Sequence, residues 1–237
     1  MQLNKLTAIS PIDGRYRKKL EALSNYFSEF ALIKYRVFVE IQYFIALWEL
    51  EIPQLLKLSK NSVKNIEQIF LGFSIEDAIY IKKIEEKINH DVKAVEYFIK
   101  DKFDELGLSK FKEFVHFGLT SQDINNTAIP LILKNFTTDY YLNKLFEVTN
   151  ELQVLIEKCE GVSVLARTHG QPASPTKLDK EIKVFKVRID EQIKILKNNL
   201  YASKFSGATG NFNAHKVSYP NVDWETFGRN FCERKLK

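Results

Sequence analysis

Residues 25–51 read "NYFSEFALIKYRVFVEIQYFIALWELE", and this stretch decides the fold class. It contains no glycine or proline, and apolar residues occupy most of the circumference of the helix that it would form. A helix that is apolar on nearly all sides is buried in a protein core. Pro53 follows shortly afterwards and predicts where the helix ends. The stretch therefore predicts a buried central helix in an all-α protein.

Shorter helical patterns follow this stretch. One covers about 60–71, and Ser74, with an aspartate three residues later, has the spacing of a capping box for a second helix. Asn89 can cap a third helix, which Gly107 would close. We therefore expect residues 1–110 to form an N-terminal helical domain.

Longer helical patterns occupy the second half. Thr120 or Ser121 can cap a helix to about residue 160, with a kink at Pro130 or a helix start after it. Ser174 at the N-cap and Pro175 at the first helical position would open another helix. Its apolar residues alternate spacings of three and four: Leu178, Ile182, Phe185, Ile189, Ile193, Leu196 and Leu200. Long helices with a narrow apolar seam are typical of a bundle, so we expect residues 111–237 to form part of one.

Composition narrows the class of protein. The chain has 237 residues, 45% of them hydrophobic and 27% charged, which is ordinary for a globular protein. Two cysteines, Cys159 and Cys232, form no CxxC pair, and no apolar run has the length of a signal peptide core or a membrane span. The net charge of +5 is spread along the chain, without a basic stripe for nucleic acid. We expect a cytoplasmic protein that binds neither nucleic acid nor membrane.

The four histidines all lie at boundaries between helical segments. They are His90, His116, His169 and His215. Capping or surface roles explain any one of them, whereas a titratable ring in "ARTHGQPAS" (166–174) could also move a proton. No HxxxH or HExxH pair is present, so we expect no metal site.

Two other polar stretches have the same two interpretations. In "TSQD" (120–123), two hydroxyls and a carboxylate stand at an expected helix N-terminus, which either caps the helix or binds an anion. In "DGRY" (13–16), Arg15 is either an exposed turn residue or a ligand for phosphate or carboxylate.

Together these stretches resemble the adenylosuccinate lyases, a family of the fumarase/aspartase superfamily. The resemblance extends from residue 1 to about residue 227. It is carried by "SPIDGRY" (10–16), "NHDVKAVEYF" (89–98), "VHFGLTSQDINN" (115–126), "RTHGQPASP" (167–175), "GATGNFNAH" (207–215) and "YPNVDW" (219–224).

The resemblance implies a reaction and a set of site residues. The family eliminates fumarate from adenylosuccinate to give AMP, and from SAICAR to give AICAR, in purine nucleotide biosynthesis. His169 would be the general acid that protonates the leaving nitrogen. The implied substrate-binding residues are Arg15, Tyr16, Asn89, His90, Asp91, Thr120 and Ser121. The family uses no cofactor and forms homotetramers whose bundles pool helices from four subunits.

One family feature has no counterpart in these 237 residues. The family's general base is a serine on a loop of the "SSxMPxKxNP" type, and no stretch here matches it. The family's chain is also about twice as long. The resemblance therefore implies a truncated N-terminal portion, with an incomplete bundle, that is inactive alone. Because the apolar seam of residues 178–200 is too long for a lone helix in water, we expect exposed apolar surface and either self-association or poor solubility. Another fumarate-releasing lyase of the superfamily and a non-catalytic helical fragment stay open as alternatives.

Overall fold

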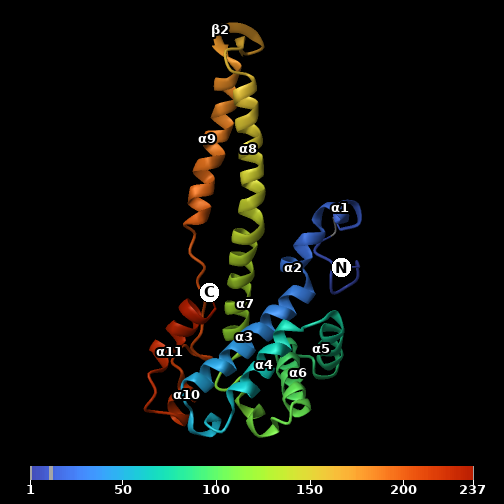
Figure 1. Ribbon diagram of the computed structural model, residues 1–237, viewed down its shortest axis with the longest axis vertical. Helices are drawn as coiled ribbons and strands as arrows, with labels where there is room; N and C mark the ends of the chain where they lie inside the picture. Colours follow the sequence, from blue (N-terminus) through green and yellow to red (C-terminus); the bar gives the residue numbers. More distant parts are fainter. Residues whose placement is uncertain (1, 11–12, 237) are drawn as a thin grey trace. The chain divides into compact units, whose positions relative to one another are not determined.

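The computed structural model describes residues 2–10 and 13–236, in two compact units (Figure 1). The main unit comprises Met1–Leu133 and Ala202–Lys237, and the hairpin unit comprises Lys134–Tyr201. Helices dominate both units, which confirms the expected helical fold. The expected domain boundary near residue 110 stays a prediction, because it separates the N-terminal domain from residues that would join a helix bundle larger than this chain.

The main unit is built around α3 (Glu29–Glu49). The helices before it are α1 (Asp13–Leu20), the 3₁₀ turn η1 (Glu21–Leu23) and α2 (Ser24–Phe27). After it come η2 (Pro53–Leu55), α4 (Lys60–Leu71), α5 (Ile75–Ile88), α6 (Asp91–Glu105), η3 (Ser109–Phe114) and α7 (Ser121–Asn135). The returning chain adds α10 (Asn213–Ser218), α11 (Trp224–Asn230) and the π-helical η5 (Phe231–Lys235).

Burial of α3 accounts for the position of the core. Fourteen of its residues are buried, and Tyr43, Phe44 and Leu47 are fully so. Phe103 of α6 packs edge-on against Phe44. Such aromatic contacts add to the apolar burial that stabilises the unit. The predicted buried central helix is therefore confirmed, although it begins at Glu29, where Ser28 accepts a hydrogen bond from the Ala31 N–H.

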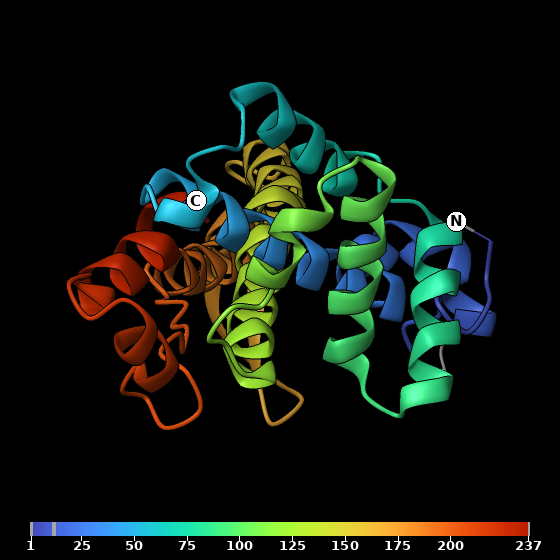
Figure 2. The same cartoon turned by 90° about the horizontal axis from the view of Figure 1, so that it is seen from below.

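Local capping explains the neighbouring helices. Ser74 and Asp77 form the predicted capping box at the start of α5. The prediction for Asn89 was wrong, because this residue ends α5 in the left-handed conformation, and His90 is the N-cap of α6. An asparagine tolerates that conformation better than most residues. The resulting turn joins α5 and α6 into a helical hairpin (Figure 2).

The hairpin unit consists of two long helices joined by a small sheet. It contains the π-helical η4 (Phe136–Tyr141), α8 (Leu142–Lys158), β1 (Ser163–Thr168), β2 (Gln171–Lys177) and α9 (Leu178–Lys197). The expected helix to about residue 160 is present as α7, η4 and α8, and α7 continues through Pro130.

The prediction that Ser174 and Pro175 open a helix was wrong. Both lie in β2, which pairs antiparallel with β1, and α9 begins at Leu178. His169 and Gly170 form the two-residue loop, with φ angles of 50° and 76°. Two positive φ angles match the turn that suits the twist of a hairpin. A two-stranded sheet also tolerates proline, since neither strand is paired on both sides.

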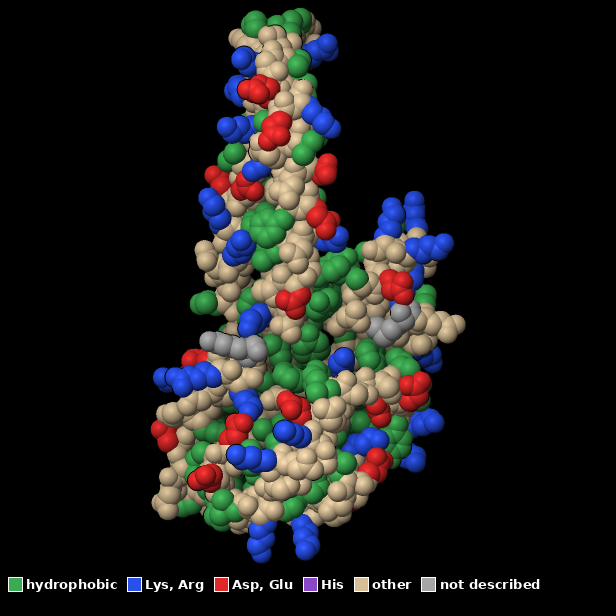
Figure 3. All heavy atoms as spheres, viewed as in Figure 1, with side chains coloured by type: hydrophobic (Ala, Val, Ile, Leu, Met, Phe, Trp, Pro, Cys, Tyr) green, Lys and Arg blue, Asp and Glu red, His purple; other side chains and the backbone are tan. Residues whose placement is uncertain are grey.

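Much apolar surface of the hairpin unit is exposed. Phe185 is 62% exposed, Ile195 65% and Leu200 90%. Charged side chains of both signs stand between such residues along the unit (Figure 3). This exposure agrees with the apolar surface expected for an incomplete bundle. Among residues 2–10 and 13–236, no helix combines the length and the apolar character needed to cross a bilayer.

The capping box provides a test of the fold. Replacing Ser74 with alanine should lower the free energy of unfolding by about 1 kcal/mol, because the Asp77 N–H loses its acceptor. Urea unfolding measures the change. The control is Ser218→Ala, since the Ser218 hydroxyl is exposed and donates only within its own helix. Equal effects of the two substitutions would contradict the capping role.

Candidate active site

The N-termini of α6 and α7 bring two predicted site residues together. His90 Nδ1 accepts a hydrogen bond from the Lys93 N–H, at 3.1 Å. A neutral His90 ring therefore carries its proton on Nε2, which lies 3.5 Å from Ser121 Oγ. Helix N-termini present free backbone N–H groups and partial positive charge. The pair therefore lies where an anionic group would be favoured.

Arg36 of α3 connects these two helix ends. Its Nη2 lies 2.6 Å from Asp91 Oδ2, and its Nε donates to Asn125 Oδ1 at 2.9 Å. Partial burial raises the pKa of Asp91, but the charge and hydrogen bond of Arg36 and the Val92 N–H together lower it more, so the pKa ends below its usual value. The predicted residues Asp91 and His90 are thus held beside α7. Sequence reasoning missed Arg36, although charged residues within a largely apolar run were a usable signal.

Glu40 lies one turn further along α3 and contacts His116. Glu40 Oε1 lies 2.5 Å from His116 Nδ1, and the Glu40 side chain is fully buried. Burial lowers the pKa of His116, but the charge and hydrogen bond of Glu40 raise it more, so that the pKa lies above its usual value. Glu40 therefore favours the protonated form of the His116 ring, which lies just before α7. Glu40 is a second residue that sequence reasoning missed.

Asp123 has a structural task within the "TSQD" stretch. Its buried carboxylate accepts hydrogen bonds from the N–H groups of Thr120, Ser206 and Gly207, and Lys204 lies 2.7 Å away. The carboxylate thus caps α7 and anchors the start of "GATGNFNAH". With Asp123 occupied in this way, the side chains of Thr120 and Ser121 remain for a ligand. Both are half-buried.

His215 is a buried histidine. Tyr43 donates its hydroxyl hydrogen to the Phe117 carbonyl, and His215 Nε2 lies 2.9 Å from the same hydroxyl. His215 Nδ1 is buried without a partner among the described residues. A Cβ at position 118 would lie 2.7 Å from the ring, so only glycine fits there. His215 therefore belongs to the buried core of the main unit and is not exposed to a ligand.

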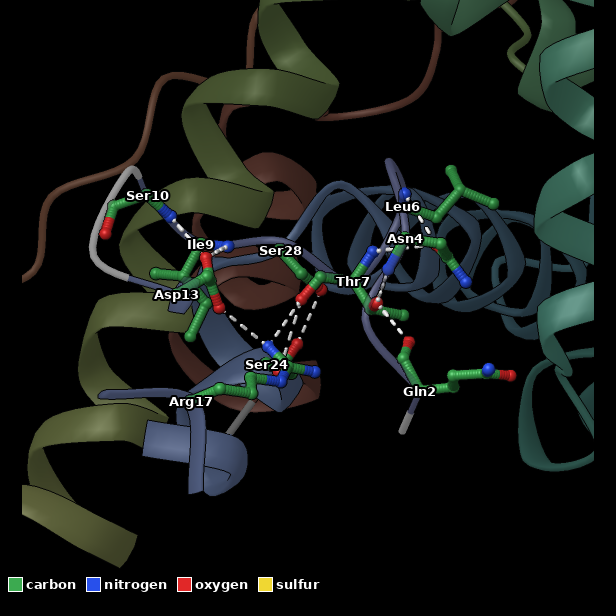
Figure 4. Close-up of polar contacts among 10 residues, drawn as sticks. All are labelled: Gln2, Asn4, Leu6, Thr7, Ile9, Ser10, Asp13, Arg17, Ser24 and Ser28. Atoms are coloured by element: carbon green, nitrogen blue, oxygen red, sulfur yellow. Dashed lines mark hydrogen bonds and ion pairs between the residues drawn. The ribbon is translucent and has the colours of Figure 1, made fainter. Parts of the chain in front are cut away.

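Arg15 and Tyr16 lie exposed on α1, with the Arg15 guanidinium 5.2 Å from the centre of the Tyr16 ring. A buried hydrogen-bond network orders the segment that carries them (Figure 4). Asp13 accepts from the Ser10 and Ile9 N–H groups, which lower its pKa. The network continues from Asp13 to Arg17, and from Arg17 and Ser24 to the Thr7 carbonyl. Pro11 and Ile12 of "SPIDGRY" lie outside the described residues.

His169 lies at the tip of the β1–β2 turn, with an exposed side chain. It belongs to the hairpin unit, whereas the other predicted site residues belong to the main unit. The structure thus brings His90, Asp91 and Ser121 together, with Asn89 and Thr120 adjacent in the chain. The assignment of His169 to the same site stays a prediction. No group of three metal-ligating side chains occurs among the described residues.

The burial of His215 predicts a pH dependence of stability. Burial lowers its pKa from 6.5 to about 4. The unfolded chain therefore binds this proton more readily, and stability is lost as the pH falls from about 6.5 to 4. We expect His215→Gln to remove a pH-dependent contribution of up to about 3 kcal/mol, measured by urea unfolding at pH 7 and 4.5.

Tyr43→Phe is the control for this measurement. It removes the hydrogen bond to His215 but leaves the ring buried, so the pH dependence should persist while the overall stability falls. An unchanged pH dependence in His215→Gln would contradict the assignment.

Comparison with known proteins supports the resemblance that these motifs carry. A family model described as "Lyase" matches residues 14–234, slightly beyond the expected limit near 227. The adenylosuccinate lyase of Dictyostelium discoideum is 51% identical over 239 residues, covering 98% of this chain and 51% of that protein. The adenylosuccinate lyase of Escherichia coli is 40% identical over 233 residues, with the same coverage. The chain spans about half the length of the curated relatives it matches.

Solved structures show the same fold at lower identity. A fumarate lyase from Mesorhizobium sp. superposes with a TM-score of 0.73 and 19% identity, covering 91% of this chain and 48% of that one. A muconate cycloisomerase from Acinetobacter calcoaceticus superposes with a TM-score of 0.68 and 17% identity, with the same coverage. The chain belongs to the lyase family of the matching model, and it resembles adenylosuccinate lyases along about half of their length.

Proposed function

We propose that this chain supplies the general acid and part of the substrate site of an adenylosuccinate lyase. The observation that carries the proposal is the meeting of two helix N-termini at His90 and Ser121, whose side chains lie 3.5 Å apart. Both residues stand in motifs that resemble the family, and the relatives at 40–51% identity are named adenylosuccinate lyases. The substrates would be adenylosuccinate and SAICAR, each of which releases fumarate.

The proposed chemistry is an elimination that breaks a C–N bond. A base removes a proton beside a carboxylate, and His169 protonates the departing nitrogen. Negative charge develops on the substrate during this step, and positioned donors stabilise it. Thr120 and Ser121 would supply hydroxyl donors. Arg15 and Tyr16 would hold the nucleotide, with Asn89, His90 and Asp91 as a further contact group.

We further propose that the 237 residues alone do not turn over substrate. Elimination requires an acid and a base on the same bound molecule. No stretch of the chain resembles the serine loop that supplies the base in the family. His169 is exposed on the hairpin tip. The exposed apolar side chains of α8 and α9 support association into a homo-oligomer, a tetramer by analogy with the family. The free cysteines suit a reducing cytoplasm.

Nucleotide binding provides the first test. AMP should raise the thermal midpoint of the purified chain, because a ligand that binds only the folded state stabilises it. Ser121→Ala should weaken this effect through loss of the hydroxyl donor. The matched control is Ser218→Ala, an exposed serine on α10, which should leave the effect unchanged. No response of the wild-type chain to AMP or adenylosuccinate would contradict a nucleotide site.

Turnover provides the second test. The chain, purified free of host lyase, should not change the absorbance of adenylosuccinate. When a C-terminal portion carrying the serine loop is supplied, activity should appear. His169→Ala should then lower turnover by at least about 10²-fold, as expected for a lost general acid, with a smaller effect on KM. If the chain alone turned over substrate and His169→Ala abolished this activity, the chain would contain a general base, contrary to the proposal. If the His169→Ala variant in the completed protein kept normal turnover, His169 would not be the general acid.

A further inference from the structure

Arg36 is a charged residue inside the apolar central helix, and only 6% of it is exposed. Its guanidinium contacts Asp91, the first residue of α6, and Asn125, in the second turn of α7. We propose that Arg36 is a positioning residue that fixes the N-terminus of α6 against that of α7, and thereby the spacing of His90 and Ser121. The identity of the ligand at this site rests on the proposed function, whereas the effect of Arg36 on the spacing of His90 and Ser121 does not.

The shape of the arginine side chain suits this task. A guanidinium is planar and has several donors in fixed directions, so that Nη2 and Nε can donate hydrogen bonds to two acceptors simultaneously. Here the acceptors belong to two different helices, and the contacts measure 2.6 and 2.9 Å. A lysine at position 36 would offer one flexible ammonium group instead. The pair of contacts therefore constrains both the distance and the rotation of the two helix ends.

Stability alone does not account for a buried charge at this position. A buried ion pair contributes little net stability, because desolvation of the charges offsets their attraction. Asp91 is 43% exposed and would stay hydrated without Arg36. Loss of Arg36 should therefore affect the geometry of the site more than the stability of the fold.

The ligand-free chain provides the first measurement. In a ¹⁵N-histidine NMR spectrum, Ser121→Ala should shift the His90 Nε2 resonance, because the two groups lie 3.5 Å apart. In an Arg36→Met background the same substitution should have no such effect. Lys82→Met is the control, since it removes a cation with two acidic partners on the same unit. An equal response in the wild-type and Arg36→Met backgrounds, or none in wild type, would overturn the proposal.

Two more variants separate positioning from folding. Arg36→Lys keeps the charge but should not restore the response, because it cannot hold both acceptors. Asn125→Ala keeps the ion pair with Asp91 and removes only the contact to α7, so it should also weaken the response. Asn125→Ala decides the question if Arg36→Met fails to fold. A full response in Asn125→Ala and Arg36→Lys would overturn the proposal.

AMP affinity provides the second measurement. Arg36→Met should raise the Kd for AMP at least about tenfold relative to Lys82→Met, as expected when a charge-assisted hydrogen bond no longer orients the site. An unchanged Kd would show that Arg36 has no positioning role in binding. If the wild-type chain does not bind AMP, the proposed function is contradicted, and the NMR response alone decides the role of Arg36.

Discussion

The structure depends on a polar stripe along the buried helix α3. Arg36, Glu40 and Tyr43 follow one another at helical spacing, and together their contacts reach three other segments of the chain. They contact the start of α6, the turn before α7, and the Phe117 carbonyl with His215. Buried polar groups are costly unless partnered. Three motifs that lie far apart in the sequence are therefore fixed to one apolar helix, and the folded core sets the geometry of the candidate site.

The helices were predictable because their signals are local. The capping box at Ser74 and the apolar run of α3 each involve few neighbouring residues, and both predictions are confirmed. The β-hairpin was not predictable in this way, since Ser174 and Pro175 also have the order of a helix start. The turn at His169 and Gly170 and the pairing of β1 with β2 decided the outcome. Pairing depends on a partner strand, which a local pattern does not contain.

In the candidate site, too, some residues could be predicted from local sequence and others depend on distant contacts. The motifs identified His90 and Ser121 as polar residues at helix starts, and the structure places them in contact. Arg36 and Glu40 contact the segments that carry these two residues, but they are at least fifty positions away in the sequence and lie in a run that reads as core. Only the packing of α3 reveals which polar atoms they reach. Asp123 shows the reverse case, because its carboxylate caps a helix and anchors a distant loop instead of facing a ligand.

The discontinuity of the main unit has a consequence for biosynthesis. Its last portion, Ala202–Lys237, leaves the ribosome only after the whole hairpin unit has been made. Until then Asp123 lacks the Ser206 and Gly207 amides, and the Tyr43 hydroxyl lacks His215. Closing so long an intervening segment also has an entropic cost that local contacts do not have. The nascent polypeptide therefore holds a partly assembled core whose polar groups lack their partners. Chaperones would bind the chain in this state, and completion of the core would be a slow, late folding step.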